Sequence, residues 1–254
     1  MKFKLITAIA LSSFVLFSGC KNDDDTTEPA PQGGQISLSL AHEVAGQPLV
    51  LNTQTYTSPG NQEYTISDFK YYISNIKLYS PDLLPWEEGE SYHFVNQLAP
   101  ESKSIILTNI EPGTYDSLIF AIGIDNNRNH TGAQTGALDP ANGMLWDWNT
   151  GYKFLQLEGK SPSSPQQNQS LVYHIGRDQN YRLVRIGFAE PIEIREGSFH
   201  SAILKVDINR IFGTADAPIL FNEVHTVMGL GNSEILANNY SKMFSLEGIF
   251  EAVE

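Results

Sequence analysis

The segment QISLSLAH, residues 35–42, alternates between apolar and small side chains. A period of two is typical of a β-strand that buries one face. The face expected to point inward carries Ile36, Leu38, Leu40 and His42. The segment therefore predicts a strand, with a histidine at the inward-facing end of its apolar face.

The same period recurs along the rest of the chain, and Gly- and Pro-rich turns separate the runs. Many short strands with regular turns favour an all-β fold, a single β-sandwich of the immunoglobulin or transthyretin kind with minor helix. A Pro-Gly turn leading into an aromatic strand at Glu111–Tyr115 is common in such domains. Further candidate strands are 69–74, 92–95, 104–107, 115–124, 152–157, 170–175, 183–188 and 201–206, and candidate helices are 208–212 and 234–243.

Two of these runs, 152–157 and 170–175, flank a polar loop at 160–169 and predict a β-hairpin. Such a hairpin would bring His174 close to the strand that follows Trp148. The register between the two strands stays open at this point. Glu158 and Glu247 both lie in Leu-Glu-Gly steps. We interpret these steps as strand ends rather than as a pair of glycosidase carboxylates.

The N-terminus predicts export. A basic start with Lys2 and Lys4 precedes an apolar run too short to span a bilayer, and small residues lead directly to Cys20. This is the pattern of a bacterial lipoprotein signal, residues 1–19, with Cys20 as the lipidated residue; the alternative is an ordinary signal peptide with an incidental cysteine. Residues 20–34, acidic and Pro/Gly-rich, predict a disordered tether before a domain at 35–254.

Cys20 is the sole cysteine, so disulfides and thiolate metal sites are excluded. The chain has 16 basic and 29 acidic residues. Without residues 1–19, which hold two lysines and no acids, the balance is 14 against 29, or −15. A domain with this charge would be repelled by nucleic acid. We expect attachment to the outer membrane through the lipid, at the cell surface, with the periplasmic face as the alternative.

The segment Gly132–Gly159 reads GAQTGALDPANGMLWDWNTGYKFLQLEG and places Trp146 and Trp148 in a loop beside a predicted strand. Core tryptophans usually lie inside elements, where their area is buried. Two interpretations stay open: a built site, or an aromatic plug that closes one end of the sandwich.

The order of several motifs resembles that of the MbnP-like family, named for a protein of methanobactin copper-chelator operons. The motifs are HEVAGQPL at 42–49, FKYYISNI at 69–76, the Gly132–Gly159 segment, YHIG at 173–176 and NNYSKMF at 238–244. The resemblance implies a periplasmic or surface copper-binding protein. It also implies a partner, a di-haem protein of the cytochrome c peroxidase type (MbnH-like), that oxidises a tryptophan to kynurenine.

The resemblance selects His42 and His174 as copper ligands, together with Trp148 or Trp146 in oxidised form. Indole itself donates only a hydrogen bond, whereas kynurenine carries an amine and a ketone. Pattern alone favours a buried structural histidine at position 42. His130 is a weaker candidate because it lies close to the tryptophan loop, and His225 is another.

The remaining candidates are weaker. His93 and His200 are interpreted as surface or core residues, and Met144 is interpreted mainly as a packing residue. No common catalytic motif is present, so we expect no enzyme. The alternative to copper binding is a surface lipoprotein that binds carbohydrate or protein through its aromatic loop.

Overall fold

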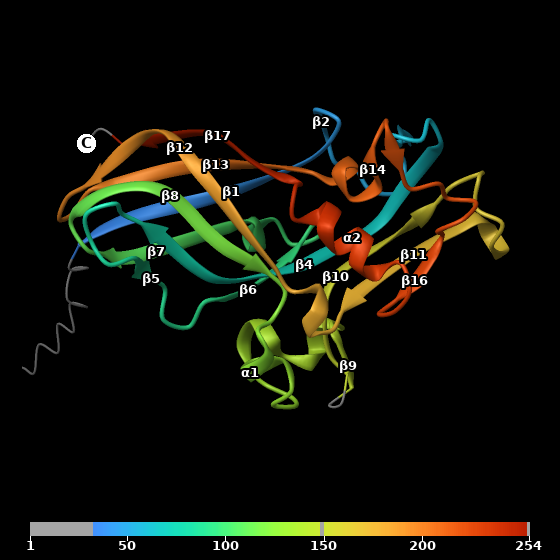
Figure 1. The fold of residues 1–254 in the computed structure, drawn as a ribbon, viewed down its shortest axis with the longest axis horizontal. Coiled ribbons are helices and arrows are strands. Elements are labelled where there is room, and N and C mark those ends of the chain that lie inside the picture. The colour runs from blue at the N-terminus through green and yellow to red at the C-terminus, as the bar shows by residue number, and fades with distance from the viewer. Residues whose placement is uncertain (1–32, 148–149, 253–254) are drawn as a thin grey trace, which may run out of the picture. The chain divides into compact units, whose positions relative to one another are not determined.

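The computed structural model describes residues 33–147 and 150–252 (Figure 1). Contacts divide the chain into two units, Met1–Ala30 and Pro31–Glu254. The predicted signal peptide, Cys20 and most of the predicted tether lie outside the described residues, as does Trp148. Within the described ranges, no helix combines the length and the apolar character needed to cross a membrane.

The described strands form two large sheets and a small one. A five-stranded sheet contains β1 (Gly34–Val44), β2 (Gln47–Pro48), β7 (Ser104–Ile110), β13 (Phe199–Asp207) and β17 (Phe244–Glu251). A ten-stranded sheet contains β3 (Tyr56–Thr57), β4 (Glu63–Tyr79), β5 (Trp86–Glu87), β6 (Tyr92–Asn96), β8 (Gly113–Ile122), β9 (Leu145–Asp147), β10 (Gly151–Lys160), β11 (Ser170–Gly176), β12 (Arg182–Ile194) and β16 (Thr226–Met228). The small sheet pairs β14 (Gly213–Thr214) with β15 (Ala217–Pro218).

Helices are short in the described part of the chain. The two α-helices are α1 (Asn126–Asn129) and α2 (Ser233–Tyr240). The 3-10 turns are η1 (Pro100–Lys103), η2 (Gly136–Leu138), η3 (Pro140–Asn142), η4 (Gln167–Gln169), η5 (Asp178–Asn180) and η6 (Ile208–Phe212).

The two large sheets pack face to face around the main core. Phe244 of β17 contacts Tyr71 of β4 and Phe120 of β8, with ring centroids 6.0 Å and 4.9 Å apart. Ile36 and Leu38 of β1 are buried between the sheets, as the alternation at 35–42 predicts. The all-β sandwich prediction is confirmed, whereas its immunoglobulin or transthyretin subtype stays a prediction. The hydroxyl of Tyr115 donates to the carbonyl of Glu111, 2.9 Å away, and so holds the Pro-Gly turn closed.

A second, smaller cluster lies on the outer face of the ten-stranded sheet. Tyr72 is next to the inward-facing Tyr71 on β4 and therefore points outward. It packs against Tyr152 of β10, and their ring centroids are 5.9 Å apart. Leu138 and Met144 are buried in the same cluster. The 132–146 loop thus lies against a sheet face and does not close an end of the sandwich as a plug.

The predicted hairpin is confirmed, because β10 and β11 pair antiparallel with Gln156 opposite His174. The interpretation of the Leu-Glu-Gly steps as strand ends holds for the first step, since Gly159 is the penultimate residue of β10, and is wrong for the second, which lies in the middle of β17. Glu158 lies within β10 and Glu247 within β17, and both steps coincide with irregularities in strand pairing. A glycine at a bulge omits a side chain where the two backbones approach closely. At Gly159 an added Cβ would lie 2.0 Å from the carbonyl oxygen of Thr65.

Candidate metal centre

His42 lies inside the sandwich, at the inward face of β1. Its side chain is 7% exposed, and its ring packs against Phe69 and Tyr71. Nδ1 contacts Oε1 of Gln97 at 2.8 Å, and Nε2 contacts the hydroxyl of Tyr71 at 2.9 Å. Since the amide oxygen accepts, Nδ1–H donates to it and Nε2 accepts from the tyrosine. Burial lowers the pKa of His42 to about 4, so the ring is neutral and its lone pair is already engaged.

His174 lies on the opposite, outer face of the ten-stranded sheet. Its Nε2–H donates to Oε1 of Glu158 at 2.7 Å, which fixes the tautomer with the lone pair on Nδ1. That Nδ1 is buried and has no hydrogen-bond partner among the residues that the structure describes. Burial lowers the pKa of His174, which favours the neutral ring. The result is an imidazole with one nitrogen anchored to a carboxylate and the other nitrogen unused.

The structure does not bring His42 and His174 together. His42 contacts Tyr71, which points into the core from β4. The residue before Tyr71 on β4, Lys70, is opposite Gln156, which is in turn opposite His174. Neighbouring residues on a strand point to opposite faces, so the ten-stranded sheet separates the two histidines.

Trp146 lies at the end of β11, in a slot made by two glycines. A methyl group at Gly176 would lie 2.7 Å from Cζ3 of Trp146 and 2.3 Å from the carbonyl oxygen of Tyr152. A methyl group at Gly229 would lie 2.9 Å from Cη2 of the same ring. The six-membered ring of Trp146 therefore occupies space that any other residue at these two positions would fill. Gly176 is two residues after His174 on β11, so the ring lies near the histidine's end of this strand.

Met228 also adjoins His174, and sequence reasoning missed it. Strands β11 and β16 pair in parallel with His174 in register with Met228. Residues in register on parallel strands point to the same face, and the burial of their neighbours Tyr173 and Val227 agrees. The Met228 side chain is 59% exposed. No sequence signal indicated this neighbour, because β16 is three residues long and lies far from β11 in the chain.

Further charged and polar side chains lie on this outer face around His174. Asp68 accepts from Nε2 of Gln156 at 2.6 Å and pairs with Lys70 at 3.0 Å. The ammonium of Lys153 donates to Oε1 of Gln156 at 2.8 Å. These contacts fix the side chains around His174, since the amide of Gln156 uses both its donor and its acceptor.

His130 is held by the carboxylate of Asp178. Its Nε2 contacts the two carboxylate oxygens of Asp178 at 2.9 and 3.1 Å. The same carboxylate accepts from Asn126 and Asn129, and these hydrogen bonds, together with His130, lower the pKa of Asp178 despite its partial burial. The structure therefore places His130 with Asp178 and not beside His174.

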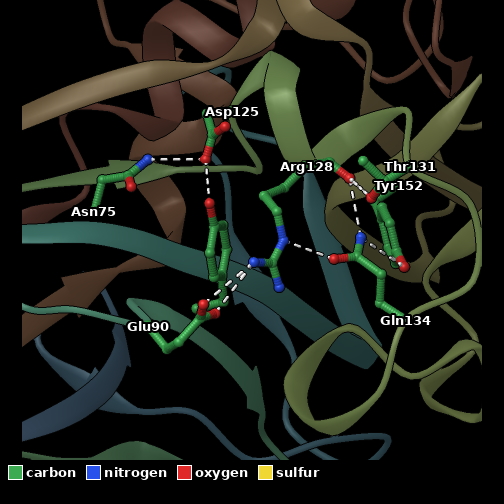
Figure 2. A network of polar contacts seen from close by, with 8 residues as sticks. Asn75, Glu90, Asp125, Arg128, Thr131, Gln134 and Tyr152 are labelled. Atoms are coloured by element: carbon green, nitrogen blue, oxygen red, sulfur yellow. Dashed lines mark hydrogen bonds and ion pairs between the residues drawn. The ribbon is translucent and has the colours of Figure 1, made fainter.

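A polar network holds the α1 segment that carries His130 (Figure 2). Arg128 donates to Oε1 of Gln134 at 2.7 Å and to Glu90 at 3.2 Å. Its guanidinium lies 4.8 Å from the ring centroid of Tyr92, whose hydroxyl donates to Asp125. This loop is thereby fixed against β6.

The weaker candidates have structural surroundings. His93 contacts Glu88 at 2.8 Å, and His200 is 4% exposed. Within the described part of the chain, Nδ1 of His225 is buried without a partner, as in His174, but no carboxylate contact anchors its other nitrogen. Met144 is fully buried in the second cluster, in agreement with a packing role. Across residues 33–147 and 150–252, no three His, Cys, Asp or Glu side chains gather closely enough to form a metal site alone.

Comparison with known proteins gives three findings. A search of curated proteins finds no match. The structure resembles MbnP from Methylosinus trichosporium with a TM-score of 0.53 at 11% sequence identity, covering 87% of this chain and 100% of the other. At this identity the likeness shows a shared fold. A sequence model of the MbnP family matches residues 33–229, and because this is more than half of the chain, the protein belongs to the MbnP family.

Proposed function

We propose that this protein binds copper on the outer face of the ten-stranded sheet, with Nδ1 of His174 as a ligand. One observation carries the proposal. The Nε2–H of His174 is anchored to Glu158, while Nδ1 is buried and unpartnered. Histidines that ligate metals almost always donate their other N–H to a carboxylate, carbonyl or water, which orients the ring and raises its basicity.

The residues present fit copper in part. A neutral imidazole suits copper, and the absence of thiolates in the domain leaves imidazole and thioether as its softer donors. The indole of Trp146 has no lone pair to give. If the family's oxidation to kynurenine occurs in this loop, at Trp146 or Trp148, the product would add an amine and a ketone beside His174. The glycine slot that holds the ring of Trp146 supports this residue as the candidate, and Trp148 lies outside the described residues.

We place His42 outside this site. Its lone pair accepts from Tyr71, and a metal would have to displace that hydroxyl within the core. We likewise place His130 outside, because it is bonded to Asp178. We propose a role in copper capture or handling, in which copper is the cargo and the protein does not act as an enzyme.

We further propose that Cys20 carries the lipid that attaches the protein to the outer membrane, at the cell surface. The support is the sequence pattern at residues 1–20 and the acidic, Pro-containing tether after it. A di-haem protein of the peroxidase type is the proposed partner that oxidises the tryptophan. The strongly acidic domain disfavours nucleic acid as a partner.

The alternative, an aromatic platform for carbohydrate or protein, has less support. Stacking on a ligand needs an open ring face and edge. The six-membered ring of Trp146 is instead wedged against Gly176 and Gly229. Because two edge atoms of the half-buried ring face these glycines, less of Trp146 is free to stack on a ligand.

The test is copper stoichiometry of the full-length protein purified from its own host. We expect about one copper per chain, lost in His174→Ala and kept in His42→Gln. His225→Gln is the matched control, because its Nδ1 is also buried and unpartnered. Retention of copper by His174→Ala, or its absence from the wild type, would overturn the proposal.

A further inference from the structure

We propose that the thioether of Met228 is a second copper ligand beside His174 and makes the site selective for Cu(I) over Cu(II). This inference rests on the proposed copper function and names the oxidation state that the site would take.

The strand register places the two side chains together. His174 and Met228 are in register on adjacent parallel strands, which are about 4.8 Å apart in a sheet. The N–H of Gly229 donates to the carbonyl of His174 at 3.0 Å, and this bond fixes the register next to the pair. Both side chains point to the outer face, and rotation about the Cα–Cβ and Cβ–Cγ bonds of Met228 moves its sulfur over the surface next to His174.

The environment of Met228 differs from that of the other methionines that the structure describes. Met144 is fully buried and Met243 is 1% exposed, whereas Met228 is 59% exposed. A single exposed apolar residue is ordinary by itself. Here, however, Met228 adjoins a histidine with a buried, unpartnered Nδ1.

The surroundings leave space beside the thioether. β16 is the last strand of its sheet path, so no further described strand pairs beyond Met228. Gly229 follows at once with φ of +76°, and its missing side chain leaves room for the Trp146 ring. Met228 therefore lies at the edge of the described sheet, in register with His174 and directly before the glycine that borders the Trp146 ring.

The types of donor atom at the site favour one oxidation state of copper. Thioethers are soft ligands that favour Cu(I), while carboxylates suit harder cations. The nearest carboxylate, Glu158, is engaged by Nε2–H of His174. An imidazole nitrogen and a thioether sulfur thus form the donor pair on this face, and that pair favours the reduced ion.

The test compares full-length wild type, Met228→Leu and Met144→Leu, all purified from the native host. Leucine conserves volume, so each variant should fold, which thermal unfolding checks. Affinity for Cu(I) is measured by competition with a chromophoric chelator, and affinity for Cu(II) is measured separately. We expect Met228→Leu to lower Cu(I) affinity by on the order of tenfold or more, because even outer-shell partners of metal ligands are worth about 10–100-fold. Cu(II) affinity should change less, and Met144→Leu should match the wild type.

X-ray absorption at the copper edge gives a second readout that does not depend on affinity. Cu(I)-loaded wild type and Met144→Leu should show a sulfur scatterer that Met228→Leu lacks. If copper binds but neither sulfur scattering nor Cu(I) affinity changes in Met228→Leu, the thioether inference is overturned and the copper proposal stands. If the wild type binds no copper, both are overturned.

Discussion

Because His42 is buried, the free energy of unfolding should depend on pH in a specific way. Burial lowers the pKa of His42 from 6.5 to about 4 in the folded protein. The unfolded chain therefore takes up the proton first as pH falls, and the contribution of His42 to stability is lost between about pH 6.5 and about pH 4. At about 1.4 kcal/mol per pKa unit, a difference of about 2.5 units amounts to about 3 kcal/mol.

His42→Gln removes this titration and keeps a neutral group that can donate to Gln97 and accept from Tyr71. We expect the variant to be less stable than wild type at neutral pH. The difference should shrink by about 3 kcal/mol as the pH is lowered to about 4, because only the wild type loses the contribution of His42. Urea unfolding of both proteins at several pH values between about 7 and about 4 measures this directly.

Tyr71→Phe serves as the control. It leaves Nε2 of His42 without its partner and should cost about 1–3 kcal/mol, while His42 continues to titrate. A stability difference between wild type and His42→Gln that stays constant with pH would refute the assignment of a neutral, buried structural histidine. Loss of copper in His42→Gln would contradict its place outside the metal site.

Three further results are expected. Gly176→Ala should destabilise the protein by about 1–3 kcal/mol in urea unfolding and quench or shift the fluorescence of Trp146, because the added methyl group would collide with the ring. Unchanged stability and an unchanged spectrum would contradict the packing of this ring against Gly176. Glu158→Gln should lower copper affinity by about 10–100-fold, because it alters the partner that orients His174, while the stoichiometry of one copper per chain should stay the same. Unchanged affinity would show that this contact has no role in copper binding. Cys20→Ser should move the protein from the membrane to the soluble fraction on cell fractionation, and continued membrane attachment would contradict lipidation at this residue.

Much of the local structure could be predicted from the sequence. The alternation at 35–42 predicted β1 and the inward direction of His42, and the polar loop at 160–169 predicted the β10–β11 hairpin. These features depend on neighbouring residues and on turn chemistry, which a single sequence displays.

Pairing between distant strands could not be predicted in this way. β1 pairs in parallel with β13, about 160 residues later, and β11 pairs in parallel with β16. Register between such strands is set by packing of whole sheets. For that reason the sequence did not indicate that Met228 lies beside His174. Met144, by contrast, lies close to Trp146 in the sequence itself.

The candidate site shows the same limit. The alternation of apolar and polar residues indicated on which face of its own strand each of His42 and His174 lies. It did not indicate that the ten-stranded sheet lies between the two histidines. Contacts of the side chains decide the rest: the lone pair of His42 is occupied by Tyr71, and that of His174 is not.

The most direct measurement is an anomalous difference map at the copper edge from crystals of the copper-loaded, full-length protein. We expect a single strong peak within bonding distance of Nδ1 of His174, on the outer face beside Met228 and Trp146. A peak at His42 inside the sandwich, or at Nε2 of His174 in place of Glu158, would contradict it.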